Sequence, residues 1–286
     1  MRKRKTTIIM IIFFFIGLLT LFYPSLSNYY NEKKQSRMIS NYENIINGNN
    51  FIDFEKEKES AINYNIALSK IKEPLLNYDR LNNYYDLLNI NKDGMMGYIT
   101  IEKIKVELPI YHGTSNEVLN SSVGHIEGSS LPIGGLTTHS VLSAHRGLPS
   151  AKLFTHLDRL EENDTFTITV YDKVFTYQVD KIVTVKPKNI EPLKISKNKE
   201  YVTLMTCTPY GINTHRLLVR AHRIDDSKKK SYITTKAFKI SKSIVWVFIS
   251  LPILFLWLVA LVLKPFNKNI DYKSIFVYPK EKIERK

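Results

Sequence analysis

A single cysteine is the most chemically distinctive residue in this chain of 286 amino acids. Cys207 follows the β-type run 201–206 (YVTLMT) and precedes a Pro-Tyr-Gly turn. A thiol at the end of a strand faces a cleft rather than the sheet interior, and a lone cysteine cannot form an intramolecular disulfide. Because the thiolate is the reactive form of cysteine, the sequence predicts that Cys207 is a nucleophile.

A nucleophilic cysteine needs a nearby cation or base, because a free thiol is mostly protonated near neutral pH. Of the seven histidines, His145 is the first candidate, since a short apolar strand (138–144) ends in His145-Arg146-Gly147. Its imidazole therefore stands where a strand meets a loop, as the thiol does. His139, at the other end of the same strand, is a weaker candidate. For each histidine the alternative is a structural or surface role, which the pattern leaves open.

Arg216 begins the β-type run that follows the cysteine turn. Strand alternation places Arg216, Leu218 and Arg220 on one face and the apolar residues between them on the other. If the apolar face packs inward, Arg216 projects towards the cleft and can stabilise an oxyanion. The alternative is a solvated basic strip formed by Arg216, Arg220 and Arg223, and alternation does not decide between the two.

The second half of the chain has the pattern of a β domain. From Gly97 the hydrophobic period changes from helical to two, which is typical of half-buried strands. The runs 165–170 and 174–179 predict a hairpin, and only residues 150–160 look helical in this half. Many short strands with few helices favour a mainly β fold, a closed or nearly closed barrel.

Two apolar runs of membrane-spanning length flank this region. The first, 6–26, follows a basic cap and ends in Phe-Tyr-Pro, so we favour an uncleaved anchor over a cleaved signal peptide. The second, 244–263, is uncharged. With the basic cap inside, both termini are cytoplasmic and residues from about 27 to 240 face outward. Lysines and arginines beside these runs explain much of the net charge of +14, and neither a nucleic-acid-binding motif nor zinc-ligand spacing is evident.

Residues 27–88 have the apolar spacing of amphipathic helices, broken at 47–50 and at Pro74. They predict a pair of helices that link the anchor to the β domain. Alternatively, the last part, up to Asn91, forms a lid over the active site.

Several separated motifs resemble the sortase family. The run 203–207 (TLMTC), with Arg216 nine positions after the cysteine, matches the sortase signature TLxTC…R. The stretches 124–132 (GHIEGSSLP), 143–147 (SAHRG) and 206–217 resemble the class C, or pilin-polymerising, sortases. The second apolar run also resembles class C.

The resemblance implies an eight-stranded sortase-type β-barrel with N-terminal helices and two flanking transmembrane helices. It implies that Cys207, His145 and Arg216 are catalytic and that no cofactor or metal is needed. The implied substrate is a pilin or surface protein with an LPXTG-like sorting signal, which is cleaved through a thioacyl intermediate and joined to a pilin lysine. The alternative is a housekeeping-type sortase that uses the amine of a cell-wall precursor. A non-catalytic, membrane-tethered binding module is a more remote alternative.

The chain departs from the class C pattern at one point. Many class C sortases carry an Asp-Pro-aromatic lid motif, but no Asp-Pro occurs upstream of Gly97, so the residue that would anchor a lid is not identified. His125, Glu127 and His215 recur in the family motif, and we expect structural roles for them.

Together these patterns predict a two-pass protein in the cell membrane of a Gram-positive-type bacterium, with its catalytic domain outside. The predicted regions are a basic cap and anchor (1–26), an extracellular helical region (27–96), the catalytic barrel (97–226), a basic linker (227–243), a transmembrane helix (244–263) and a basic tail (264–286).

Overall fold

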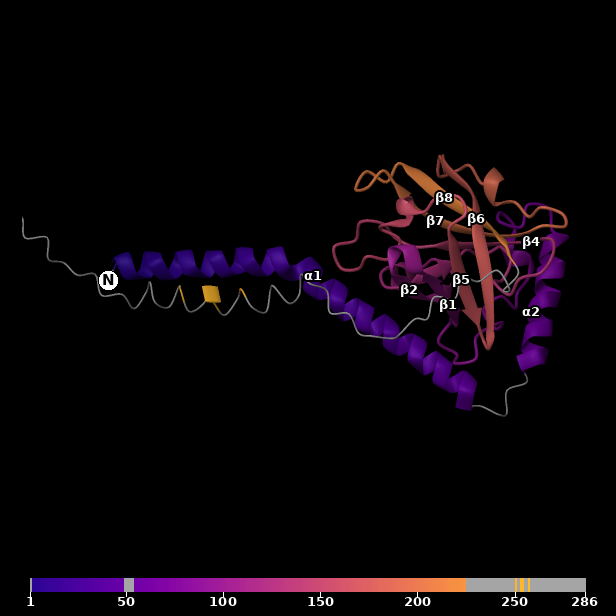
Figure 1. The fold of residues 1–286 in the computed structure, drawn as a ribbon, viewed down its shortest axis with the longest axis horizontal. Helices are drawn as coiled ribbons and strands as arrows, with labels where there is room; N and C mark the ends of the chain where they lie inside the picture. The colour runs from indigo at the N-terminus through magenta and orange to yellow at the C-terminus, as the bar shows by residue number, and fades with distance from the viewer. Residues whose placement is uncertain (1, 49–53, 225–249, 251–252, 255–256, 258–286) are drawn as a thin grey trace, which may run out of the picture. The chain divides into compact units, whose positions relative to one another are not determined.

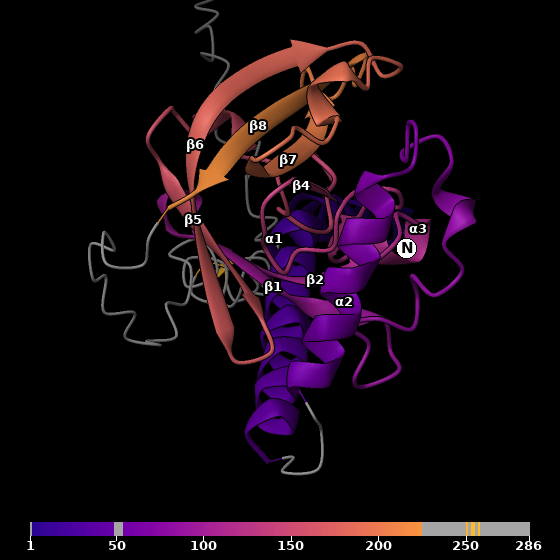
Figure 2. The ribbon, with the colours of Figure 1, turned by 90° about the vertical axis from the view of Figure 1, so that its right-hand side faces the viewer.

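The computed structural model describes residues 2–48 and 54–224, together with 250, 253–254 and 257. Among these residues, eight strands close into a barrel in the order β1-β2-β3-β4-β7-β8-β6-β5. Figures 1 and 2 show the long strand β6 beside β5 and β8. The predicted eight-stranded barrel is therefore confirmed. The predicted C-terminal span, 244–263, falls almost entirely outside the described residues.

The structure contains helices, strands and short 3-10 helices (η) in the following order along the chain. Their bounds are α1 (Arg2–Gly48), α2 (Phe54–Ser69), η1 (Tyr78–Arg80), β1 (Met95–Ile101), η2 (Glu102–Ile104), β2 (Val106–His112), α3 (Asn116–Leu119), β3 (Val123–His125), β4 (Thr138–Ser143), η3 (Leu157–Arg159), β5 (Thr165–Val170), β6 (Lys173–Val185), η4 (Glu191–Leu193), β7 (Glu200–Thr208) and β8 (His215–Arg223).

Most neighbouring strands are antiparallel, but β2–β3 and β4–β7 are parallel pairs. The predicted hairpin is present as β5 and β6, which pair from Val170–Lys173 outward. The register of β6 shifts between Val179 and Lys181. A bulge of this kind bends a strand, which lets β6 pair with β5 near its start and with β8 up to its end.

The barrel interior is filled by the apolar half of each alternating strand. On β7 and β8 the inward residues include Leu204, Val219 and Ala221, each fully buried. They belong to one continuous core that also contains Ile99 and Phe154. The apolar face of β8 therefore packs inward, which is the condition under which Arg216 projects outward.

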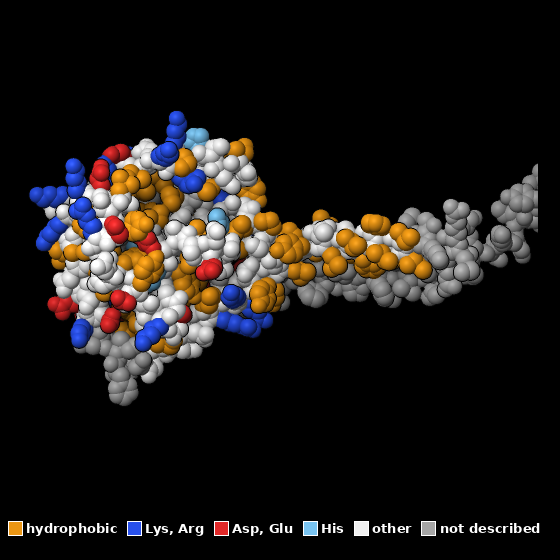
Figure 3. All heavy atoms as spheres, turned by 180° about the vertical axis from the view of Figure 1, so that it is seen from behind, with side chains coloured by type: hydrophobic (Ala, Val, Ile, Leu, Met, Phe, Trp, Pro, Cys, Tyr) orange, Lys and Arg blue, Asp and Glu red, His pale blue; other side chains and the backbone are white. Residues whose placement is uncertain are grey.

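α1 is one continuous helix that passes through Pro24. Its first half exposes large apolar side chains such as Phe13 and Leu19. Figure 3 shows hydrophobic side chains along the part of the helix that projects from the barrel. Among the described residues, α1 alone contains a helical segment long and apolar enough to cross a membrane. Its second half packs on the barrel, where the Tyr42 hydroxyl donates to the Met96 carbonyl (3.0 Å) and accepts from the Tyr171 amide (2.8 Å).

The helix predicted at 150–160 is wrong. The Phe154 amide donates to the His145 carbonyl (3.2 Å) instead of to a carbonyl four residues earlier, and Leu153 has a positive φ of 40°. Turns and the short η3 therefore replace a helix, while Leu153, Phe154 and Leu157 are still buried. The short elements α3 and β3 were not predicted either.

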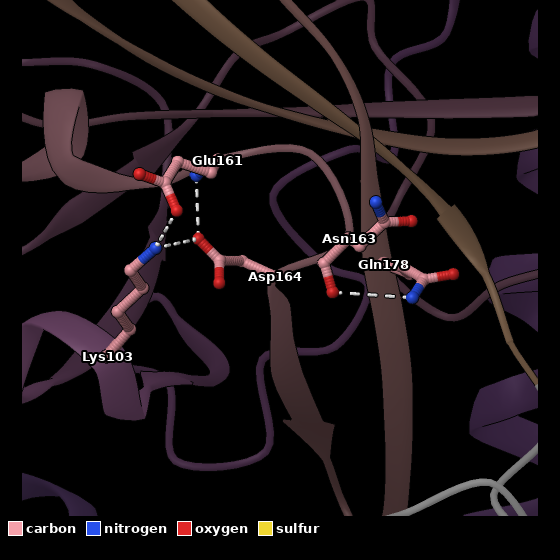
Figure 4. Close-up of polar contacts among 5 residues, drawn as sticks. All are labelled: Lys103, Glu161, Asn163, Asp164 and Gln178. Carbon is pink, nitrogen blue, oxygen red and sulfur yellow. Dashed lines mark hydrogen bonds and ion pairs between the residues drawn. The ribbon is translucent and has the colours of Figure 1, made fainter.

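A polar corner ties the end of β1 to the start of β5 (Figure 4). The Lys103 ammonium on η2 contacts the carboxylates of Glu161 and Asp164, each at 2.8 Å. Asp164 also accepts from the Glu161 amide (2.6 Å), and the Gln178 amide group donates to the Asn163 carbonyl (3.3 Å). These contacts link the loop before β5 to η2 on one side and to β6 on the other.

Candidate active site

Cys207 and Arg216 lie directly opposite each other on neighbouring strands. They are Cα partners in the antiparallel ladder of β7 and β8, one residue before β7 ends. On β7, Val202, Leu204 and Thr206 are buried on the inside of the barrel. Cys207 is therefore on the outer face, where its side chain is partly exposed. Alternation likewise places Arg216 on this face, because its neighbour Leu217 belongs to the core.

His145 is brought beside Cys207 by the parallel pairing of β4 with β7. The last ladder pair is Ser143 with Met205, which are the residues two positions before His145 and Cys207. Two further hydrogen bonds continue the pairing, from the Ala144 amide to the Met205 carbonyl (3.2 Å) and from the Thr206 hydroxyl to the Ala144 carbonyl (2.8 Å). Cys207 and Arg216 thus pair at one end of the barrel, and His145 follows two residues after β4 at the same end, in the segment that continues beside β7.

Partial burial shifts the protonation equilibrium of His145. Desolvation lowers the pKa of its imidazole below the ordinary histidine value, because burial disfavours the charged form. The neutral imidazole therefore predominates at neutral pH. In this form it can accept a proton from a neighbouring thiol, and the resulting imidazolium can later donate that proton.

The arginines of β8 are not one solvated strip. Arg220 makes two hydrogen bonds to Asp180 (3.0 and 2.9 Å) and lies over the ring of Tyr201, 4.3 Å from its centroid. Arg216, by contrast, contacts only backbone carbonyls, those of Asn213 (3.3 Å) and His215 (3.2 Å), in the part of the chain that the structure describes. Its guanidinium is thus held in place without a carboxylate that neutralises it, which suits a group that stabilises an oxyanion.

His139 and His125 are buried and fully engaged in hydrogen bonds. His139 contacts the Lys194 carbonyl (3.0 Å) and the Thr203 hydroxyl (2.7 Å) through its two ring nitrogens. His125 contacts the Tyr84 hydroxyl (2.8 Å) and the Ser130 carbonyl (2.8 Å). Burial lowers the pKa of each to about 4. Both are therefore neutral and structural, and His139 connects β4 to the loop between β6 and β7.

Two family-motif residues remain. Glu127 accepts a hydrogen bond from the Tyr85 hydroxyl, and His215 pairs with Thr208, next to the Cys207–Arg216 pair. His215, the first residue of β8, contacts the neighbouring Thr214 hydroxyl through Nδ1 at 3.0 Å.

A second hydrophobic cluster covers the outer face next to Cys207. We call it the outer cluster. Its buried members are Val141, Leu193 and Leu218, and the side chains packed against them are Leu75, Ile126, Val183, Val185 and Met205.

The register places strand residues of the outer cluster next to the site. Met205 pairs with Leu218, which pairs with Val183, and this row lies two residues along the strands from Cys207 and Arg216, on the same face. Three members come from outside the barrel strands: Ile126 from the residue after β3, Leu193 from η4 and Leu75 from the turn segment after α2. A groove 670 Å³ in volume extends from there between residues 69–75 and 190–198.

Leu75 and Leu193 are functional candidates that sequence reasoning missed. Neither lies in a periodic element, so no local pattern distinguished them from other loop leucines. The Glu73-Pro74-Leu75 sequence was the available signal, because a proline there fixes the backbone of a tight turn. Among the described residues, no group of three histidine, cysteine, aspartate or glutamate side chains could hold a metal ion.

Comparison with known proteins gives a consistent result. The model of the Sortase domain family matches residues 99–224. Among solved structures, the chain is similar to sortase C1 from Streptococcus agalactiae, with 47% identity, a TM-score of 0.60, and coverage of 66% of this chain and 98% of that one. It is also similar to sortase C from Streptococcus pneumoniae, with 41% identity, a TM-score of 0.59, and coverage of 66% and 97%. That structure is described as informative on catalysis and pilin substrate specificity.

A curated relative is more distant. Sortase A of Streptococcus agalactiae is 30% identical over 130 residues, which are 44% of this chain and 52% of that protein. The chain thus spans about half the length of this curated relative.

Proposed function

Because this chain belongs to the sortase family, whose members are cysteine transpeptidases, we propose that it cleaves an LPXTG-like sorting signal and joins it to a lysine amine of a pilin. The observation that carries the proposal is the juxtaposition of Cys207, His145 and Arg216 at one end of the outer barrel face. The similarity to sortase C structures supports a pilin as substrate and as acceptor.

The proposed reaction follows from the positions of these three groups. Neutral His145 takes the proton of the Cys207 thiol, and the thiolate attacks the carbonyl of the threonine in the signal. Arg216 stabilises the oxyanion that develops, because its guanidinium is fixed by backbone carbonyls and free to donate outward. The imidazolium of His145 then protonates the departing glycine amine, which leaves a thioacyl enzyme. A lysine amine attacks the thioacyl carbonyl, with His145 accepting its proton. Collapse of this adduct forms the isopeptide bond, breaks the thioester bond and releases the Cys207 thiolate, which regains a proton from His145.

A second acceptor is supported by the similarity to sortase A. In that alternative the same three residues transfer surface proteins to the amine of a cell-wall precursor. Deleting the gene separates the two: loss of pilus ladders alone supports the pilin acceptor, whereas loss of most wall-anchored proteins supports the cell-wall precursor.

We further propose that α1 anchors the enzyme in the membrane through its exposed apolar half, with the barrel on the outer side. An LPXTG-bearing substrate held in the same membrane then meets the enzyme at raised effective concentration. The proposed second pass, at 244–263, rests on its sequence alone.

We also propose that the segment around Leu75 is the lid. Leu75 packs against the outer cluster beside Cys207 and so occupies the surface that a sorting signal needs. The lid approaches the barrel closely at Gly128: a Cβ there would lie 2.4 Å from the Pro74 carbonyl oxygen. Glu73-Pro74-Leu75 would then take the place of the Asp-Pro-aromatic motif.

Replacing Cys207 by alanine tests the central assignment. We expect no cleavage of an LPXTG peptide and no thioacyl adduct by mass spectrometry, while urea unfolding stays as in the wild type because the side chain lies outside the core. Cleavage by C207A would refute the assignment. Protection of the wild-type thiol from a mild thiol reagent by the same peptide would exclude the non-catalytic binding module.

A further inference from the structure

The part of α1 just beyond its apolar half is fastened to the loop that follows the catalytic histidine. The Asn28 carbonyl oxygen Oδ1 accepts from the Lys152 amide (2.9 Å), and the Asn31 side chain donates to the Ser150 carbonyl (2.8 Å). Glu32 adds an ion pair with the Lys152 ammonium at 3.4 Å. The apolar run ends at Leu26, so these contacts start two residues after it.

The same loop is closed onto His145. The Phe154 amide donates to the His145 carbonyl (3.2 Å), and the Gly147 amide donates to the Thr155 hydroxyl (3.2 Å). Lys152, which is hydrogen-bonded to Asn28 of α1, is therefore only two residues from Phe154, whose amide binds the His145 carbonyl. The helix and the catalytic histidine are connected by a short series of backbone contacts.

Farther along, α1 contacts the opposite end of the barrel. The Tyr42 hydroxyl accepts a hydrogen bond from the amide of Tyr171, which lies in the turn between β5 and β6. The last residue of β6, Val185, pairs with Arg216. Since β6 has 13 residues, the two ends of this strand lie about 40 Å apart along its contour. The end of α1 nearest the apolar run therefore lies at the catalytic end of the barrel.

The catalytic end also exposes apolar side chains. Tyr210 and Ile212, in the turn that follows Cys207, are 59% and 68% exposed. The Arg146 guanidinium lies 6.0 Å from the centroid of the Tyr210 ring. An exposed tyrosine and isoleucine next to a cation are typical of a surface that meets the interface of a bilayer.

From these contacts we propose that α1 holds the catalytic end of the barrel against the outer surface of the bilayer, with Tyr210 and Ile212 in contact with lipid. The proposal rests on the proposed function and on α1 as the anchor. The proposal fixes the distance of the catalytic centre from the bilayer surface, which we call its height. The helical rise from Leu26 to Asn28 and the two residues from Lys152 to Phe154 together place His145 within roughly 20 Å of the end of the apolar run.

A fixed height selects substrates by the distance between the sorting motif and the substrate's own membrane span. An extended peptide covers about 3.3 Å per residue, so about six residues reach from the bilayer surface to a centre at this height. Signals with shorter spacers cannot deliver their threonine carbonyl to Cys207. Longer, flexible spacers reach it with an effective concentration that falls only gradually.

The height of the catalytic centre above the bilayer can be measured with a series of substrates that differ in the length of the spacer between the sorting motif and the transmembrane helix. Full-length enzyme is reconstituted in vesicles of phosphatidylglycerol and phosphatidylethanolamine, with LPXTG peptides joined to a transmembrane helix by 2 to 18 residues. A seven-residue alanine-rich insertion between Leu26 and Asn28 adds two helical turns, about 10 Å. We expect the shortest productive spacer to lengthen by about three residues, while a soluble LPXTG peptide is cleaved at the wild-type rate. An unchanged spacer minimum with intact soluble activity would overturn the proposal.

The lipid contact is tested separately and without catalysis. In the C207A background, which has no other cysteine, an environment-sensitive fluorophore is attached to I212C or to the control V174C. Val174 is also exposed, but it lies at the start of β6, at the other end of the barrel. We expect brominated lipids to quench the probe at position 212 at least threefold more than the probe at 174. Equal quenching, or quenching at 212 only after a sorting-signal peptide is added, would contradict the lipid contact.

The two experiments fail in different ways. If wild-type enzyme cleaves neither soluble nor membrane-held peptides, the proposed function fails, whereas the quenching comparison still decides where the catalytic end lies.

Discussion

The inner and outer faces of β7 and β8 contrast sharply although their residues alternate along the same strands. On the inner face, Leu204 and Val219 are fully buried in one continuous core. On the outer face, Cys207 and Arg216 are partly exposed, and the apolar residue Met205 is covered by side chains from other segments. One face thus holds the barrel together, while the other carries the residues to which we assign the chemistry. Mutations on the two faces should therefore separate stability from activity.

The largest effect is expected from the inner face. Leu204→Ala removes a fully buried side chain and should lower the free energy of unfolding by about 2–5 kcal/mol, because it loses hydrophobic burial and leaves a cavity. Urea unfolding followed by circular dichroism measures this loss. Met205→Ala, the neighbour on the outer face, is the matched control and should cost less stability but raise KM for the peptide. An equal loss of stability in both variants would show that the two faces are not distinct.

Arg216→Lys addresses the outer face. It retains the charge but removes the planar fork, so kcat/KM for an LPXTG peptide should fall about 100- to 1000-fold, as when an oxyanion-hole donor is lost. The unfolding midpoint should not change. Arg220→Lys is the control: it breaks the paired hydrogen bonds to Asp180 and should affect activity by less than threefold. Similar activity losses in the two variants would favour a diffuse basic strip.

Acid should weaken the structure through the buried histidines. Burial lowers the pKa of His125 and of His139 to about 4, whereas the unfolded chain binds these protons near pH 6.5. Each histidine therefore contributes stability that is fully present above pH 6.5 and is lost as the pH falls towards 4, by about 3 kcal/mol each. Unfolding measured from pH 7 to 4 checks this, and His125→Gln should flatten the slope. An unchanged slope in that variant would contradict the assignment.

Much of the inner face could be predicted from the sequence, because it depends on local alternation. The strands, the hairpin and the grouping of the apolar residues on one face of β8 follow from the period of two. The helix predicted at 150–160 failed because the Phe154 amide donates to the His145 carbonyl, nine residues earlier, instead of to a carbonyl four residues earlier. Local periodicity does not distinguish such turns from a helix.

The outer face was predictable only in part. The positions of Cys207, His145 and Arg216 at strand ends, together with the family motifs, indicated the residues that the ladder places side by side. The cover over the outer face was not predictable, because Leu75 and Leu193 reach the outer cluster from two loops far apart in sequence. Contacts between loops leave no periodic pattern in either one.

The smallest effect, and the sharpest test of this cover, is expected at Leu75. Leu75→Ala removes the side chain that packs on the outer cluster beside Cys207, so labelling of the thiol by a mild reagent should accelerate severalfold. Leu76→Ala is the matched control, because Leu76 is 61% exposed and its loss should leave the rate unchanged. The stability cost of L75A should be well below that of L204A, since Leu75 is only partly buried. If L75A and L76A react at the wild-type rate, the segment does not cover the thiol, and the outer face is open without a lid.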